Sequence, residues 1–451
     1  MSPLPPGPKS LPLLDFLRAG LGSPVPVFRR LAAEHGDTFR FSAQSGPMTV
    51  TGDPEAIRAI YTADPDTFSA WGAEIAEPVF GRTSLVVASG ARHRRDRKLL
   101  TPPFNAGTMR DYGATIAEIA AAAAARWTPG RPFSMLETTQ AIALDVIVRV
   151  VFGVRESRVR ATREAILGLI DSLTPLLFMF PWLRRDFGGL GPWAKNRRAL
   201  AALDALLIEE IRARRSGDDV GQDILGLMLS ARYDDGSVMD EREVAEQLRG
   251  LLFAGHETTA VVLAWALHWT HGDPEVLARV LAELDALGPA PEPDAFASLP
   301  YLEAVCHETL RLNPPVVDVG RVPRAPFQLK RFTIPAGEGL VPSPLLLHRR
   351  EDLYPEPESF RPSRFLGRKF SPFEYIPFGG GSRRCLGAAF AMYEMKVILG
   401  TVLRGYRLRL ASASPIAYVR RGITMGPRGG VPMICDGERE RASSRIQASA
   451  A

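Results

Sequence analysis

Phe378-Gly-Gly-Gly-Ser-Arg-Arg-Cys385-Leu-Gly387 stands directly before AAFAMYEMKVILG, a segment whose composition predicts a helix. We call this stretch the cysteine loop. Cys385 would lie at the N-terminus of that helix, where free N–H groups and the helix dipole favour the thiolate. Arg383 and Arg384 add positive charge beside it. The glycines lack Cβ atoms, so the backbone can approach a large flat partner closely.

A lone thiolate narrows the chemistry that this loop can support. With no second Cys or His nearby it cannot complete a zinc site, but it suffices as an axial ligand to haem iron. A buried free cysteine is the common alternative, although it leaves the surrounding glycines and arginines unexplained. A catalytic nucleophile would need a histidine base, which the sequence cannot place in space. All three roles stay open for Cys385 at this point.

The composition excludes several classes of protein. The chain has 451 residues, 46% hydrophobic and 23% charged, an ordinary balance for a soluble globular protein. Three cysteines without a CxxC spacing exclude a disulfide scaffold and suggest a reducing compartment. The net charge of +5 is too small to indicate nucleic-acid binding. No signal peptide is recognisable and no uncharged apolar segment reaches ~20 residues, so we expect a cytoplasmic protein without a membrane anchor.

The pattern along the chain predicts a mainly α protein with a minor β portion. The expected elements are an extended Pro-rich segment at 1–12, a short helix at 26–35, strands within Thr38–Thr51, helices over 110–285 and short strands after 315. The helix from Asp240 to Thr270 is the longest, and its second half is apolar all round, so it should cross the core. No Gly/Ser linker divides the chain, and residues 436–451 form a polar tail that we expect to be disordered.

The cysteine loop resembles a known signature. Phe378-x-x-Gly381-x-Arg383-x-Cys385-x-Gly387 is similar at every specified position to the haem-binding motif of the cytochrome P450 family. With three further motifs in the family's order, the resemblance covers roughly residues 4–430. It implies the cytochrome P450 fold, with haem b (iron protoporphyrin IX) between a long central helix and the cysteine loop, and with Cys385 as iron ligand. Because the matching residues must meet at one haem, we expect residues 1–435 to form a single haem-binding monooxygenase domain.

Ala254-Gly255-His256-Glu257-Thr258-Thr259 lies midway along the long helix. Glycine and threonine oppose helix propensity, and a threonine hydroxyl can bond the i−4 carbonyl and bend the helix. On the residues alone, a helix-packing glycine is the more common explanation. The segment also resembles the family's oxygen-activating motif. This implies that Glu257 and Thr258, with water, supply protons beside the haem.

Glu308-Thr-Leu-Arg311 falls on a helix expected to begin at Pro300, and its i,i+3 spacing places both charged side chains on one face. Most such pairs are exposed and contribute well under about 1 kcal/mol. The segment resembles the family's ExxR motif, with Arg364 as third member. The resemblance implies a structural lock that holds the cysteine loop and takes no part in the chemistry.

Gly90–Leu100 predicts a basic helix that ends before Pro102-Pro103. Alone, it is consistent with a solvated helix or with a patch that binds phosphate or nucleic acid. By the resemblance, its His93 and Arg97 bind the haem propionates, and the other basic residues form a docking surface for an acidic redox protein. The complete set of implied cofactor-binding residues is His93, Arg97, Ala254, Gly255, Arg321, Phe378, Arg383 and Gly387.

Together the residues predict a haem-thiolate monooxygenase that inserts one oxygen atom from O2 into a hydrophobic small molecule. No flavin or iron–sulfur module is recognisable, so we expect electrons from a ferredoxin or flavodoxin with its NAD(P)H-dependent reductase. A peroxide-using or isomerising relative is the first alternative, although the Glu257–Thr258 pair favours O2. A non-enzymatic haem sensor or carrier is the second. We expect a monomer that binds neither nucleic acid nor a membrane.

The substrate pocket is expected, from family position, to be largely apolar. Its expected residues are Val79, Phe80, Leu177, Ala254, Val316, Val317 and Met425. Such a lining favours a hydrophobic substrate, although each residue is equally consistent with core packing. Asp318 is the one acidic candidate, and we expect it to serve a turn. The stretches 97–104 and 180–187 resemble a bacterial branch that includes fatty-acid and secondary-metabolite oxidases. This favours hydroxylation or epoxidation of a fatty acid, terpenoid or polyketide-type metabolite.

Overall fold

The structure, a computed structural model, describes residues 3–43, 46–104, 106–173, 177, 181–186, 188–217 and 220–440. Its α-helices are α1 (Leu13–Leu21), α2 (Val25–His35), α3 (Pro54–Thr62), α4 (Ala73–Phe80), α5 (Gly90–Leu100), α6 (Ala106–Asp111), α7 (Gly113–Ala124), α8 (Met135–Val146), α9 (Glu156–Ser172), α11 (Gly191–Arg215), α12 (Ile224–Ser230), α13 (Glu241–Gly272), α14 (Pro274–Ala286), α15 (Pro293–Ala297), α16 (Pro300–Leu312), α17 (Pro344–Leu347) and α18 (Ala388–Gly405). Its strands are β1 (Thr38–Ala43), β2 (Gly46–Thr51), β3 (Phe68–Ala70), β4 (Pro132–Ser134), β5 (Arg321–Pro323), β6 (Phe327–Leu329), β7 (Phe332–Ile334), β8 (Gly339–Pro342), β9 (Tyr406–Leu410), β10 (Tyr418–Arg421), β11 (Thr424–Pro427) and β12 (Pro432–Glu438).

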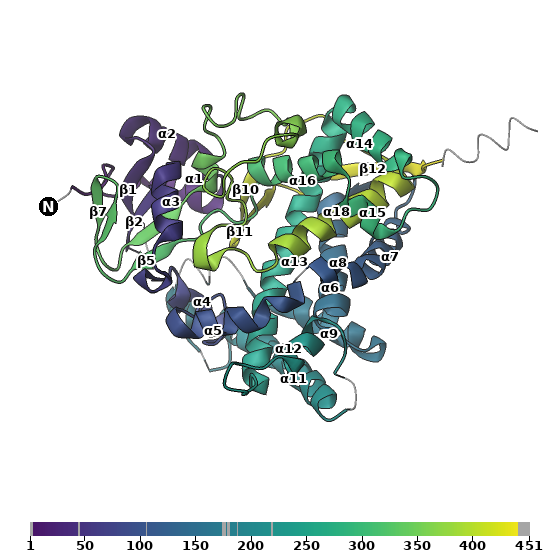
Figure 1. Ribbon diagram of the computed structural model, residues 1–451, viewed down its shortest axis with the longest axis horizontal. Helices are drawn as coiled ribbons and strands as arrows, with labels where there is room; N and C mark the ends of the chain where they lie inside the picture. Colours follow the sequence, from purple (N-terminus) through teal and green to yellow (C-terminus); the bar gives the residue numbers. More distant parts are fainter. Residues whose placement is uncertain are drawn as a thin grey trace, which may run out of the picture.

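The largest sheet brings both halves of the chain together at one end of the molecule (Figure 1). Its order is β1-β2-β8-β5-β3, with β2 antiparallel to β1 and parallel to β8. Alternate residues of β1 face inward, so Phe39 and Phe41 pack on Phe28 of α2, with ring centroids 6.0 and 6.2 Å from it. The aromatic and β-branched residues within Thr38–Thr51 therefore form the predicted strands and carry part of the core.

The long helix α13 crosses the helical part of the molecule and defines its core. It begins with a capping box in which the Asp240 carboxylate accepts from the Glu243 N–H and the Glu243 side chain accepts from the Asp240 N–H. In its second half Val261 and Leu263 are fully buried, and the helix packs against α8, α18 and β11. In the described part of the chain, α13 alone is long and apolar enough to cross a membrane, and 67% of its apolar window is buried in the protein. Packing in the core accounts for its hydrophobicity.

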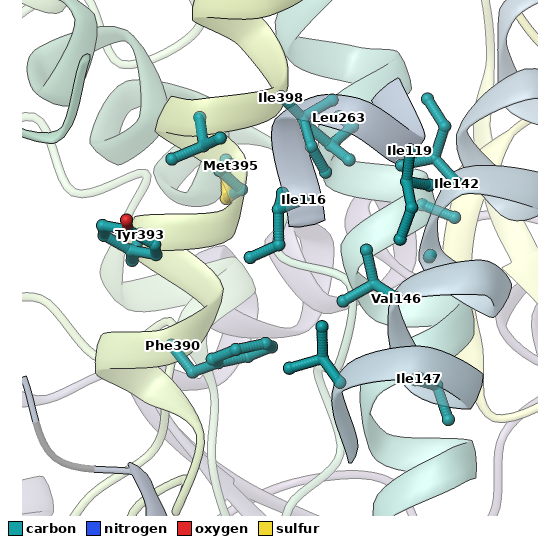
Figure 2. Packing of buried hydrophobic residues seen from close by; sticks show 14 of the residues in the cluster. Ile116, Ile119, Ile142, Val146, Ile147, Leu263, Phe390, Tyr393, Met395 and Ile398 are labelled. Atoms are coloured by element: carbon teal, nitrogen blue, oxygen red, sulfur yellow. The ribbon is translucent and has the colours of Figure 1, made fainter. Parts of the chain in front are cut away.

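Figure 2 shows this core where α7, α8, α13 and α18 meet. Ile116, Ile142, Leu263 and Met395 are each at most 1% exposed. Because the helix after the cysteine loop packs on the same residues as α13, the core fixes the loop relative to the central helix.

The predicted class, mainly α with a minor β portion, is confirmed, and α2 and α13 lie within two residues of their predicted bounds. Helix α1 was not predicted; its buried Asp15 pairs with Arg30 of α2 at 2.7 Å, a contact that the sequence does not reveal. The expected boundary at 435 falls inside β12, which pairs with β9 as far as Glu438. Residues 436–438 therefore form strand, and the expectation of disorder was wrong for them. Residues 441–451 of the tail and parts of 180–187 lie outside the described residues.

Candidate active site

The cysteine loop is closed by its own backbone. The Cys385 N–H donates to the Phe378 carbonyl at 2.9 Å, and Gly381 adopts a φ of 63°, which favours glycine. A Cβ at Gly380 would lie 2.2 Å from the ring of Tyr61, and one at Gly381 would lie 2.7 Å from the carbonyl oxygen of the same tyrosine. These two glycines therefore make room for Tyr61 of α3, and not for the large flat partner that we expected.

Cys385 is exposed to a cavity of about 1350 Å³. Gly387 lines the same cavity, and a Cβ there would meet nothing within 4 Å. Seclusion from bulk water raises the pKa of the Cys385 thiol, while a hydrogen bond from the Gly387 N–H and the charge of Arg97 act to lower it. The positive charge and free N–H groups that were expected to favour the thiolate are thus present, but burial raises the pKa of the thiol by more than they lower it. Cys385 is accessible from this cavity, whereas the other two cysteines of the chain are buried in the core.

Four basic side chains converge on one part of this cavity. His93 and Arg97 of α5, Arg321 of β5 and Arg383 of the cysteine loop all line it. The guanidinium groups of the three arginines donate to backbone carbonyls: Arg97 to Arg384 at 2.6 Å, Arg321 to Gly380 at 3.2 Å and Arg383 to Ala88 at 2.6 Å. Within the described residues no carboxylate pairs with any of the three arginines. The site is therefore positive and not neutralised, as an anion-binding site must be.

Burial and mutual repulsion shift the ionisation of this basic group. Burial, reinforced by Arg383, Arg97 and Arg321, lowers the pKa of His93 to about 4. Burial and neighbouring arginines lower the pKa of Arg383 to about 10. His93 is therefore neutral at pH 7 and presents one N–H donor, whereas the arginines stay charged. The structure brings together all four residues that the sequence predicted.

The middle of α13 forms another part of the cavity wall. Ala254, Gly255 and Thr258 line it, and the Thr258 hydroxyl donates to the Ala254 carbonyl one turn earlier. The helix stays α-helical throughout, and a Cβ at Gly255 would lie 3.3 Å from Ile147. Gly255 is thus a helix-packing glycine, as the simpler explanation held, and it also borders the cavity.

The side chain of Glu257 makes its contacts outside the cavity lining, unlike that of the neighbouring Thr258. Its carboxylate accepts a hydrogen bond from Gln140 at 2.7 Å and pairs with the guanidinium of Arg421 at 3.1 Å. Thr258 is among the described residues that line the cavity, and Glu257 is not. The two residues that were predicted to act together are therefore separated in this conformation.

A second acid, Glu394 of α18, was missed by the sequence analysis. It lines the cavity, is 3% exposed and accepts a hydrogen bond from the Thr259 hydroxyl at 3.5 Å. Burial raises the pKa of Glu394 to about 8, so the group is largely protonated at pH 7. Its only sequence signal is a charge inside the apolar run after the cysteine loop.

The predicted lock is present and buried. The Arg311 guanidinium binds both oxygens of Glu308, at 2.7 and 2.8 Å, and both side chains are 0% exposed. Arg364 donates to the same carboxylate at 2.9 Å. Arg311 also donates to the carbonyls of His348 and Pro357, at 2.8 and 2.7 Å. A fully hydrogen-bonded buried carboxylate therefore ties α16 to the segments before the cysteine loop.

His348, which the sequence analysis did not single out, connects the lock to the loop. Its Nδ1 lies 3.2 Å from the Arg311 carbonyl, and its Nε2 accepts from the Ile376 N–H at 2.9 Å. Ile376 in turn accepts from the Gly379 N–H at 3.0 Å. Complete burial and the charge of Arg311 hold the pKa of His348 well below its usual range. The neutral ring, with its proton on Nδ1, satisfies both contacts.

The cavity wall beyond these residues is mostly apolar. The predicted Phe80, Ala254, Val316 and Val317 line it. The prediction is wrong for Val79, Leu177 and Met425, which are at most 3% exposed and lie outside the described lining. Met425, for example, packs with Phe28 and Phe41 because β11 faces the sheet end of the core. Trp71 also lines the cavity, where Gly320 and Gly339 leave room for its ring.

This cavity fits haem b. Cys385 offers an exposed sulfur, the wall is open at Gly387, and four basic residues without carboxylate partners suit two propionates. No group of three His, Cys, Asp or Glu side chains able to hold a metal ion occurs in the described chain. The macrocycle would therefore supply the remaining iron ligands, with a single thiolate from the protein.

Sequence comparison places this site in a family. A model of the cytochrome P450 family matches residues 5–430. The chain is 36% identical over 440 residues to cytochrome P450 135B1 of Mycobacterium tuberculosis, which covers 95% of this chain and 90% of the relative. It is 34% identical over 388 residues to cytochrome P450 138 of Mycobacterium bovis, covering 85% of each.

Solved structures agree. Retinoic acid-bound cyanobacterial CYP120A1 superposes with a TM-score of 0.85 at 26% identity, covering 97% of this chain and 100% of that one. The heme domain of cytochrome P450DA gives a TM-score of 0.86 at 24% identity, covering 97% and 98%, and shows the shared fold. With an accessible thiol, a basic haem cradle and matches over nearly its whole length, the chain belongs to the cytochrome P450 family and is a haem b-dependent monooxygenase.

Proposed function

We propose that Cys385 ligates the haem iron and that His93, Arg97, Arg321 and Arg383 hold the propionates. The observation that carries this is the convergence of these donors, free of carboxylate partners in the described chain, on the cavity that also exposes Cys385. When bound, haem supplies reductive activation of O2 for transfer of one oxygen atom to substrate. His93 contributes an N–H donor, and the arginines contribute charge.

Proton delivery is proposed to end at the Thr258 hydroxyl, which lies in the cavity wall. Glu257 would reach it only after leaving Arg421 and Gln140, because both of its oxygens are engaged there. Protonated Glu394, hydrogen-bonded to Thr259 and bordering the same cavity, offers a second proton store that needs no such movement. Proton transfer from Glu257 therefore requires its ion pair with Arg421 to break first, whereas proton transfer from Glu394 does not.

The substrate is proposed to be a hydrophobic small molecule, a fatty acid, terpenoid or polyketide-type metabolite. Apart from the haem cradle, the cavity wall is dominated by apolar side chains, among them Phe80, Val86, Phe253, Val316 and Ile423. The likeness to the retinoic acid-bound cyanobacterial protein supports a terpenoid. We also propose a role in bacterial secondary metabolism, in the cytoplasm.

Electrons are proposed to come from a ferredoxin or flavodoxin with its NAD(P)H-dependent reductase. Arg384, exposed beside Cys385, would attract an acidic carrier. The enzyme would act as a monomer.

Labelled oxygen tests this function. Haem-loaded enzyme would be incubated with a surrogate ferredoxin and reductase, NADPH, 18O2 and a panel of hydrophobic substrates. We expect a product that carries one labelled atom and forms only with the complete electron-transfer system. A product that forms only with hydrogen peroxide, or a rearranged product without label, would instead establish a peroxide-using or isomerising enzyme.

A further inference from the structure

An ion pair lies in the otherwise mostly apolar wall of the cavity. Asp318, in the segment after α16, and Arg420 of β10 both line the cavity, and the Arg420 Nη2 donates to the Asp318 Oδ2 at 2.5 Å. Pro315, Val319 and Ile423 border the same region. Asp318 was expected to serve a turn, and its carbonyl accepts from the Gly320 N–H at 3.1 Å. Its side chain pairs in addition with Arg420 in the cavity wall.

Arg420 is held in place from three directions. Its backbone N–H donates to the Gly22 carbonyl at 2.8 Å, its Nε donates to the Ala19 carbonyl at 3.3 Å, and its Nη2 binds Asp318. Helix α1, which packs beside β10 (Figure 1), therefore anchors the guanidinium group. The ordering of this long side chain is complete before any ligand arrives, so binding to it costs little further side-chain entropy.

The guanidinium nonetheless keeps free donors. Among the described residues Nη1 has no hydrogen-bond partner, and the Arg420 side chain is 18% exposed while lining the cavity. The Asp318 side chain is 27% exposed, and its Oδ1 has no partner in the described chain. An anchored N–H donor beside an anchored carboxylate is thus available to a molecule in the cavity.

We propose that Arg420 Nη1 recognises a neutral acceptor oxygen, a ketone, ester or hydroxyl, on an otherwise apolar substrate. The inference rests on the proposed hydrophobic substrate and narrows its class. The Asp318–Arg420 pair is neutral as a whole, so it offers a hydrogen bond without a net attraction for anions. A substrate carboxylate at Nη1 would lie close to Asp318, and like charges in a secluded site repel each other strongly. Asp318 therefore selects against free acids.

Three probes of one chain length test this: lauric acid, methyl laurate and dodecane, titrated into haem-loaded enzyme while displacement of water from the iron is followed spectrally. We expect the wild-type enzyme to bind methyl laurate about tenfold more tightly than lauric acid. The Arg420→Met variant should bind methyl laurate about tenfold more weakly and dodecane as before, and Arg420→Lys should restore part of the difference. Asp318→Asn should bind lauric acid at least as tightly as methyl laurate.

Arg409→Met is the matched control, because the Arg409–Asp436 pair on β9 and β12 lies outside the described cavity lining. It should leave all three affinities unchanged. If Arg420→Met lowers only the unfolding midpoint and leaves the ratio of the three affinities unchanged, the pair is a tether for α1 and the inference is wrong. If the wild type binds dodecane and methyl laurate equally tightly, Arg420 does not recognise the ester oxygen and the inference is wrong. The proposal of a hydrophobic substrate is then unaffected. If none of the three perturbs the spectrum, the proposed substrate class fails with it.

Discussion

Thr258 is the proposed end point of proton delivery to the cavity. Its hydroxyl lies in the cavity wall and donates to the Ala254 carbonyl of its own helix. Replacing it by alanine removes the hydroxyl and leaves the helix intact. We expect Thr258→Ala to lower product formed per NADPH by on the order of tenfold or more, with NADPH consumption maintained. Thr401→Ala removes the same kind of i−4 hydrogen bond from α18, outside the described cavity lining, and should leave coupling unchanged. Unchanged coupling in Thr258→Ala would remove this hydroxyl from proton delivery.

The Glu394 carboxyl stays protonated in the folded enzyme over a pH range in which it is ionised in the unfolded chain. Because burial raises the pKa of Glu394 from 4.5 to about 8, the native state holds this proton between those pH values while the unfolded state releases it. The contribution of Glu394 to the free energy of unfolding must therefore fall as pH rises through this window, by at most about 1.4 kcal/mol per pH unit. Glu394→Gln should unfold in urea with a flatter pH dependence between pH 5 and 8. An identical slope in both proteins would show that the carboxyl does not hold this proton.

The neighbouring residues Glu257 and Thr258 show which features of the site a local sequence pattern cannot predict. The resemblance to the oxygen-activating motif implied that Thr258 lies beside the haem, and the structure places Thr258 in the cavity wall. The direction of the neighbouring Glu257 depends on Gln140 and Arg421, which lie 117 and 164 residues away in the chain. Contacts over such separations leave no local pattern, so the ion pair that withdraws Glu257 could not be predicted.

At the scale of elements, the lock decides where the cysteine loop sits. Removing Arg311 leaves Glu308 buried with two of its hydrogen bonds lost. We expect Arg311→Met to lower the free energy of unfolding by about 3–5 kcal/mol and to reduce the haem content of the purified protein. Arg160→Met is the control, because the Arg160–Glu164 pair on α9 is exposed and its loss should leave the free energy of unfolding nearly unchanged. Similar losses in both variants would contradict a special role for the buried pair.

His348 transmits the position of the lock to the loop. Its two ring nitrogens join the Arg311 carbonyl to the Ile376 N–H, two residues before the cysteine loop. The resemblance to the ExxR motif singled out Glu308 and Arg311, which a helix brings together through their i,i+3 spacing. Nothing in the sequence around His348 marks it, since its partners come from α16 and from the loop.

For the whole molecule, the sequence predicted the features that depend on a single motif or on the periodicity of apolar residues along one helix. The helical pattern gave α13 to within two residues, and the cysteine loop gave the cavity's chemistry. The directions of some side chains were harder to predict: Leu177 and Met425 turn into the core, while Arg420 turns toward the cavity. Each of these directions is set by packing between distant segments, which a single sequence does not display.

The central claim is that Cys385 is the iron ligand, and the carbon monoxide difference spectrum of the reduced, haem-loaded enzyme tests it most directly. Three proteins would be compared: the wild type, Cys385→Ser and Cys306→Ser, the last removing a thiol that is fully buried in the core. The account predicts the red-shifted Soret band of thiolate ligation in the wild type and in Cys306→Ser, and its loss in Cys385→Ser. A folded, haem-loaded Cys385→Ser protein that kept the red-shifted band would contradict it, as would a wild type that lacked the band.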